Sequence, residues 1–178
     1  MRTNAISIAN YFIDKANENR EGRHPFTLLR LVKYVYIAYG FGMAILDKKI
    51  IDERFDKVEA WKYGPVIPSV YHSFKHNGKD PITTKSIVLV QEEEDGTPDF
   101  ITPEIDRNNT ALVKLLDFVW DRYEDKSISE LIDILHDDGT PWKYCYKEGE
   151  NVSIPDEMTK IYYDSIVENA IQSWKKKR

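Results

Sequence analysis

Two histidines, His72 and His76, are the first residues of this chain whose types and spacing could do chemistry. They lie four residues apart, so on a helix they would share one face, where two imidazoles can bind one metal ion. A metalloprotease motif needs a glutamate directly after the first histidine, but Ser73 stands there. The pair is therefore a metal-site candidate, and the alternative is two surface histidines near a helix end.

A third histidine, His136, directly precedes Asp137, Asp138 and Gly139. A histidine beside carboxylates could act as a general base or bind a cation. Two carboxylates at a helix C-terminus are disfavoured by the helix dipole, which makes the arrangement notable. We favour the simpler interpretation, in which this is a solvated helix end and His136 bonds a nearby carbonyl.

Other catalytic signatures are weak. Cys145 is the only cysteine in the sequence, so no internal disulfide can form, which agrees with a reducing cytoplasm. No local signal pairs it with a histidine, and a small buried thiol is the commoner case. Residues 40–42, Gly-Phe-Gly, lack the third glycine and the preceding strand of a phosphate loop. The sequence therefore predicts a protein that is not an enzyme and needs no cofactor.

Residues 59–68, Glu-Ala-Trp-Lys-Tyr-Gly-Pro-Val-Ile-Pro, form the most specific stretch of the chain. Gly64 can adopt backbone angles closed to other residues, and Pro65 has a fixed φ. The last proline suits the first turn of a helix. Trp61 and Tyr63 are thus held beside a rigid corner, and both residue types are favoured in protein interfaces.

Lys33 belongs to a long apolar segment, where its charge must reach solvent or a carboxylate. Glu59 is a candidate partner. An internal Lys33–Glu59 pair that fixes the corner and a direct contact of Lys33 with a partner protein remain equal alternatives. The predicted partner-binding residues are Lys33, Tyr36, Glu59, Trp61, Lys62, Tyr63, Gly64, Pro65, Val66 and Tyr71.

The elements that must position these residues are mostly helices. Apolar periodicity and capping signals predict helices at about 4–18 and 28–46, after Pro68, across 112–123, from the Ser127-x-x-Glu130 capping box, from Thr140, and at about 155–174. Short strands at 87–90 and 100–101 form a hairpin around an Asp95-Gly96 turn. We expect one compact, mainly α domain over residues 1–178, with a small β-hairpin.

Two of these helices carry further expectations. The segment 28–46 is apolar nearly all round, so it should be the buried centre of the bundle, and Gly40 and Gly42 in it mark either a close approach or an early end. The amphipathic helix at 155–174 should turn its apolar residues inward. These are Met158, Ile161, Tyr162, Ile166, Ala170 and Trp174.

The composition limits the possible partners. The net charge of the 178 residues is −5, from 25 basic and 30 acidic side chains, which argues against broad binding of nucleic acid. The basic residues 175–178 are best explained as a soluble end. The first five residues do not resemble a signal peptide, and the uncharged stretch 34–46 is too short to span a bilayer. We expect a cytoplasmic protein with no membrane partner.

The corner motif, Glu-x-Trp-x-x-Gly-Pro-Val-x-Pro followed by Val-Tyr, resembles the signature of the Panacea antitoxin domain, also described as the SocA-like or phage-associated GepA-like domain. Further segments resemble that family in the same order, over about residues 5–147. They are residues 9–13, 27–36 and 129–132, with His136, Pro141 and Trp142. The departures are Arg30 for Lys, Val32 for Gln and Tyr34 for Leu.

The resemblance implies an antitoxin, which neutralises a toxin encoded by the adjacent gene through direct binding, or delivers it to a protease. It also implies that His136, Pro141 and Trp142 belong to a shared structural corner. Two alternatives remain. One is an enzyme that uses the histidines, with or without a metal. The other is a DNA-binding autoregulator of phage or mobile-element origin that uses the helices at 4–46. The sequence leaves the oligomeric state open.

Overall fold

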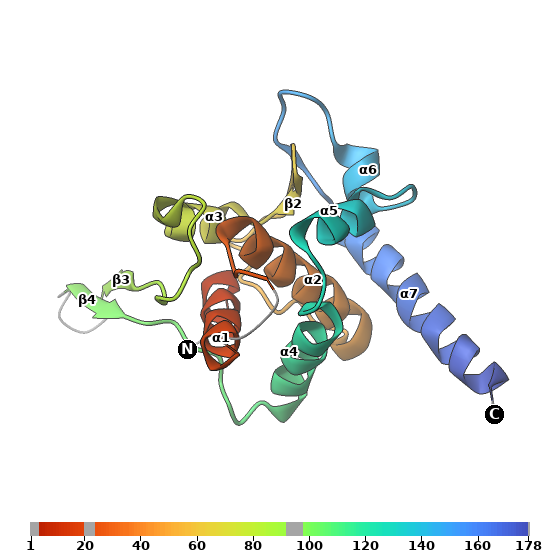
Figure 1. Cartoon of the computed structure of the whole chain (residues 1–178), viewed down its shortest axis with the longest axis horizontal. Helices are drawn as coiled ribbons and strands as arrows, with labels where there is room; N and C mark the ends of the chain where they lie inside the picture. The colour runs from red at the N-terminus through yellow and green to blue at the C-terminus, as the bar shows by residue number, and fades with distance from the viewer. Residues whose placement is uncertain (1–3, 20–23, 92–97, 178) are drawn as a thin grey trace.

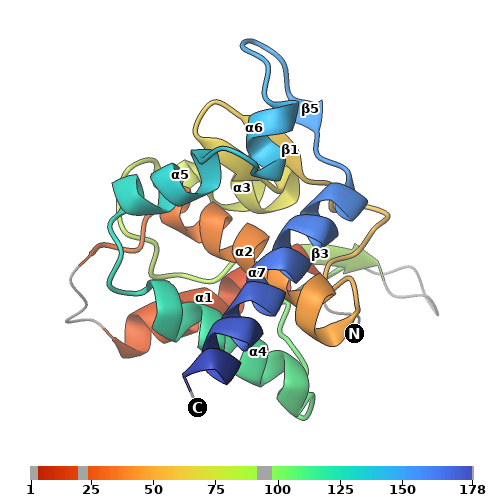
Figure 2. The same ribbon diagram turned by 90° about the vertical axis from the view of Figure 1, so that its right-hand side faces the viewer.

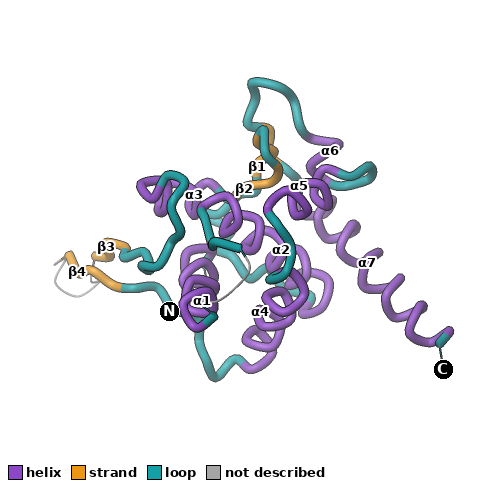
Figure 3. The backbone as a smooth tube through the Cα atoms, in the orientation of Figure 1, coloured by secondary structure: helices purple, strands orange, loops and turns teal. Residues whose placement is uncertain are grey.

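The computed structural model describes residues 4–19, 24–91 and 98–177, and these form a mainly helical fold with small β elements (Figures 1 and 3). This confirms the predicted fold class. In chain order the elements are α1 (Ala5–Glu18), α2 (Leu28–Leu46), β1 (Glu59–Trp61), β2 (Gly64–Val66), α3 (Pro68–Phe74), the 3-10 turn η1 (Lys75–Asn77), β3 (Val88–Gln91), β4 (Pro98–Ile101), α4 (Thr110–Tyr123), α5 (Ile128–His136), α6 (Pro141–Cys145), β5 (Val152–Ser153) and α7 (Asp156–Lys176).

Helix α2 is the centre of the fold, as its all-round apolar sequence predicts. Helices α1, α3, α4, α5 and α7 pack around it (Figures 1 and 2). By length and hydropathy α2 could cross a bilayer, but 83% of its apolar window is buried inside the fold. It is thus a core helix, and its burial also prevents it from entering a DNA groove as a recognition helix.

Gly40 allows α7 to approach α2 closely. A Cβ atom on Gly40 would lie 2.2 Å from the ring of Tyr163, a residue of α7 that is itself buried. The same ring meets Phe41 edge-on at a centroid distance of 4.9 Å. Of the two interpretations of this glycine, the close approach is therefore the one that the structure adopts, and α2 continues to Leu46.

Two small sheets complete the fold. The first has the antiparallel order β2-β1-β5, in which Trp61 pairs with Gly64 and Ala60 with Val152. The second is the predicted hairpin of β3 and β4, with Leu89 opposite Phe100. The expected Asp95-Gly96 turn lies outside the described residues.

Side-chain caps set the starts of the two helices that carry the histidine and tryptophan of the family motif. The predicted capping box opens α5, since Ser127 Oγ accepts from the Glu130 N–H at 3.2 Å and Glu130 Oε2 accepts from the Ser127 N–H at 2.7 Å. At α6, Thr140 Oγ1 accepts from the Lys143 N–H at 3.3 Å. These caps determine where His136 and Trp142 stand.

The prediction for the last helix is wrong for three of its six inward residues, Ile161, Ala170 and Trp174. Thr159 and Tyr163 are buried, but Ile161 is 63% exposed, Trp174 is 55% exposed, and Ala170 is also exposed. In Figure 1 the C-terminal half of α7 extends past the body of the molecule. Ile161 precedes Tyr163 by two residues, so at about 100° per residue it lies on the opposite side of the helix. Periodicity defines an apolar face, but only the tertiary structure decides whether a neighbour covers it.

Candidate functional site

The motif of residues 59–68 forms the turn between β1 and β2 and the start of α3. Gly64 has a φ of +105°, a conformation that favours glycine, which is the backbone freedom that the sequence analysis attributed to this residue. A Cβ atom at this position would lie 2.9 Å from Lys33 Nζ and 3.3 Å from His136 Nε2. The β1–β2 turn, helix α2 with Lys33 and the end of helix α5 with His136 therefore meet directly beneath the corner.

Lys33 supports the corner from below, but the group that it bonds is not Glu59, the candidate partner from the sequence. Its side chain is fully buried, and Nζ donates a hydrogen bond to the Pro65 carbonyl at 3.1 Å. Glu59 instead accepts a hydrogen bond from Trp61 Nε1 at 2.7 Å. Burial lowers the pKa of Lys33 to about 7, because the interior disfavours the charged form.

His136 and Trp142 form the wall beside this lysine. Their rings are stacked at a centroid distance of 3.5 Å with an interplanar angle of 2°, and Trp142 Nε1 donates to the Trp61 carbonyl at 2.8 Å. His136 Nε2 is buried without a hydrogen-bond partner, so the expected bond from this atom to a carbonyl is absent. Burial lowers the pKa of His136, and the charge of Lys33 lowers it further.

The predicted histidine–aspartate arrangement is not assembled. Asp137 and Asp138 are both exposed, and Asp137 Oδ1 accepts from the backbone N–H of Asp138 at 2.9 Å. His136 instead contributes its ring to the buried stack. Two of the family motif residues, His136 and Trp142, thus pack against each other at this corner.

Five of the ten predicted partner-binding residues are buried, which corrects the sequence-based list. They do not form part of the exposed surface in this conformation, and one of them, Tyr36, packs against Tyr163 of α7. They are Lys33, Tyr36, Gly64, Pro65 and Val66.

The other five, together with one histidine, form the outer face, which we call the corner surface. Tyr63 is 54% exposed, and Lys62 Nζ lies 5.6 Å from the centre of its ring. The ring of Trp61 meets that of Tyr71 edge-on at a centroid distance of 4.8 Å, and the ring of Tyr71 meets that of His72 at 5.5 Å. The corner surface consists of Glu59, Trp61, Lys62, Tyr63, Tyr71 and His72.

The metal-site candidate is not a helical pair. His72 lies in α3, but His76 lies in η1, where the tighter 3-10 winding takes it off the face of His72. Across the described ranges, no three or more His, Cys, Asp or Glu side chains are grouped so that they could hold a metal ion.

Cys145, the other candidate for chemistry, is half-buried in α6. Its Sγ lies 3.8 Å from Met158 Sδ, and burial raises the pKa of the thiol.

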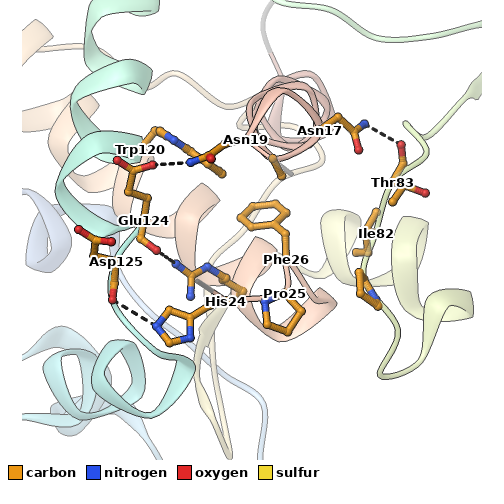
Figure 4. Close-up of a pocket in the computed structure, with 13 residues that line it drawn as sticks. Asn17, Asn19, His24, Pro25, Phe26, Ile82, Thr83, Trp120, Glu124 and Asp125 are labelled. Atoms are coloured by element: carbon orange, nitrogen blue, oxygen red, sulfur yellow. Dashed lines mark hydrogen bonds between the residues drawn. The ribbon is translucent and has the colours of Figure 1, made fainter. Parts of the chain in front are cut away.

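A pocket of about 650 Å³ opens between α1, the start of α2 and the end of α4, away from every predicted site residue (Figure 4). Phe26 and Trp120 contribute its apolar part. Hydrogen bonds between its own lining groups tie its walls together, for example from Asn19 Nδ2 to Glu124 Oε2 at 3.0 Å.

Arg30, which also lines this pocket, is a buried charged residue whose role the sequence analysis missed. Its guanidinium donates to the carbonyls of Tyr123, Glu124 and Lys126, and so closes the C-terminus of α4. The available signal was an arginine inside an apolar helix, which must find acceptors within the fold. This departure from the family pattern therefore has a structural use.

Comparison with known proteins agrees with this geometry. The family described as "Antitoxin SocA-like, Panacea domain" matches residues 31–143, which include most of α2, the corner surface and the His136–Trp142 stack. The chain belongs to this antitoxin family, as the sequence motif indicated. It is 29% identical over 138 residues to "Antitoxin SocA" of Caulobacter vibrioides (strain NA1000 / CB15N), covering 78% of this chain and 68% of that protein. No solved structure matches the chain.

Proposed function

We propose that this protein is the antitoxin of a toxin–antitoxin pair and that it neutralises a cognate protein toxin by direct binding through the corner surface. The observation that carries the proposal is an exposed aromatic turn on a rigid support. Tyr63 is 54% exposed at the tip, while Lys33 and Trp142 hold the backbone on either side through bonds to the carbonyls of Pro65 and Trp61.

Such a surface suits a binding hot spot. Aromatic residues supply large contact areas and lose little conformational entropy when their positions are already fixed. The bond of Trp61 Nε1 to Glu59 and the edge contact with Tyr71 hold the indole in place before binding. The net charge of −5 would assist the approach of a basic toxin.

Several finer points belong to the same proposal. The toxin is the product of the adjacent gene, the pair acts in the cytoplasm, and residues 1–178 form one domain that includes α7. Delivery of the toxin to a protease is an additional mechanism that would use the same contact.

Co-expression with the product of the adjacent gene tests the proposal. We expect growth rescue and a complex that co-purifies, and we expect Tyr63→Ala or Trp61→Ala to weaken both without unfolding the chain. Phe100→Ala is the matched control, because this aromatic residue of β4 is 71% exposed. Strand β4 lies away from β2 and the corner (Figure 1). Circular dichroism of each variant separates a lost contact from a lost fold.

The proposal would be contradicted if the toxin did not bind the protein and co-expression did not rescue growth. Equal loss of rescue in Phe100→Ala and Tyr63→Ala would contradict the assignment of the corner surface. The half-life of the toxin after a translation block distinguishes the two mechanisms. Simple binding leaves it unchanged or longer, whereas delivery to a protease shortens it only when the antitoxin is present.

A further inference from the structure

The exposed C-terminal half of α7 continues the face that packs on the body. Tyr163, Val167, Ala170 and Trp174 follow one another at spacings of four, three and four residues. This is the heptad spacing of a coiled-coil seam, so the four side chains lie in one row along the helix. Tyr163 is buried and Val167 half-buried, whereas Ala170 and Trp174 are exposed. The face of α7 that packs against the body is therefore exposed to solvent in the C-terminal half of the helix.

Ile171 widens this face. It is 48% exposed and lies on the flank of the row, one residue after Ala170. A large ring at Trp174 next to a methyl group at Ala170 gives a protrusion and a recess that are about one helical turn apart. Such a surface is self-complementary when a second helix runs in the opposite direction, since each indole then faces the alanine of the other helix.

The order of charges along α7 selects that direction. Asp164 and Glu168 precede the exposed row, and Lys175, Lys176 and Lys177 follow it. Asp164, Glu168 and Lys175 share one flank of the helix at about 100° per residue. An antiparallel copy would bring Lys175 beside Glu168 of the other helix, while a parallel copy would bring the lysines together.

We propose that the C-terminal half of α7 is a self-association surface, on which a second copy of this chain packs antiparallel through Ala170, Ile171 and Trp174. A two-fold arrangement is consistent with the shape of the molecule, because this half of the helix extends beyond the other helices (Figure 1). The contact covers about ten residues of each helix, roughly 15 Å. It is smaller than a typical stable interface, so the dimer should be weak and dependent on concentration.

Sedimentation velocity or light scattering of the purified full chain tests this directly. We expect a mass near 20.9 kDa at micromolar concentration that rises toward twice that value in the range of hundreds of micromolar. Trp174→Glu should abolish the rise. Ile161→Glu is the matched control, because Ile161 is 63% exposed on the opposite side of the same helix, and this variant should still dimerise.

A charge exchange tests the orientation. Glu168→Lys should weaken the dimer a few-fold, and the addition of Lys175→Glu should restore it, because antiparallel packing places these two positions together. Restoration does not occur if the helices are parallel.

A chain that stays monomeric at all concentrations overturns the proposal, as does a dimer that survives Trp174→Glu. A third outcome also overturns it: the chain is monomeric, and Trp174→Glu loses toxin neutralisation, so that the toxin covers this face. All mass measurements use the chain without toxin, so their failure would leave the antitoxin proposal standing.

Discussion

Replacing Lys33 with methionine should change how the stability of the protein depends on pH. The ammonium group is fully buried, and its one hydrogen bond in the described structure is to the Pro65 carbonyl. Burial lowers its pKa to about 7, whereas an unfolded chain keeps the ordinary value of about 10.4. Methionine has a similar length and no charge.

The sign of the effect follows from proton binding. Between pH 7 and the ordinary lysine pKa, the unfolded wild type retains a proton on Lys33 that the folded protein has largely released. Unfolding therefore takes up a proton, and the free energy of unfolding rises with pH by at most about 1.4 kcal/mol per pH unit. Between pH 7 and pH 9.5 the wild type should gain roughly 3 kcal/mol relative to Lys33→Met.

Urea unfolding followed by circular dichroism, at half-unit steps from about pH 6 to pH 9.5, measures this difference. Near pH 6 we expect Lys33→Met to be at least as stable as the wild type, because burying a cation on a single hydrogen bond costs more than that bond returns. Lys62→Met is the control, since Lys62 is exposed in the same corner, and its profile should parallel that of the wild type.

Parallel profiles for the wild type and Lys33→Met would refute the reasoning. They would mean that Lys33 keeps an ordinary pKa, so that an anion or water compensates its charge in the folded state. The reasoning would also be refuted if the free energy of unfolding of the wild type, relative to that of Lys33→Met, fell as the pH rises. That is the sign expected for a lysine paired with a carboxylate.

Three substitutions test the packing of the fold and of the corner by urea unfolding. Gly40→Ala should destabilise the fold by about 2–3 kcal/mol, because its Cβ atom would lie 2.2 Å from the Tyr163 ring. Gly42→Ala should destabilise it less, because the nearest atom to its Cβ, on Ile50, would be 3.0 Å away. Equal losses of stability in the two variants would contradict this reasoning. Trp142→Phe should cost about 1–2 kcal/mol, because it removes the bond to the Trp61 carbonyl but keeps a ring for stacking, and an unchanged stability would show that this bond does not hold the corner.

The helices of this protein were predictable because their signals are local. Apolar residues at helical spacing define α1, α2 and α4, and the Ser127–Glu130 capping box sets the start of α5 within a few residues of chain. The positive φ of Gly64 was predictable for the same reason, since a glycine before a proline in a short turn carries its own conformational signal.

The partners of buried polar groups were not predictable, because they come from distant parts of the chain. One of the two alternatives for Lys33 was a bond to a carboxylate, yet Lys33 bonds the carbonyl of Pro65. Arg30 likewise bonds carbonyls at the end of α4. A backbone carbonyl is present at every residue, so no sequence pattern marks the one that will accept such a bond.

The sequence alone determined the family, the helical class and the rigid corner, because each depends on residues close together in the chain. Which of the predicted apolar or surface residues face solvent was decided by the tertiary structure alone. Val66 and Tyr36 are buried although they belong to the predicted surface, while Ala170 and Trp174 are exposed although their spacing predicts a buried face. Amphipathic periodicity specifies that a face can be buried, and only the placement of neighbouring elements decides whether it is.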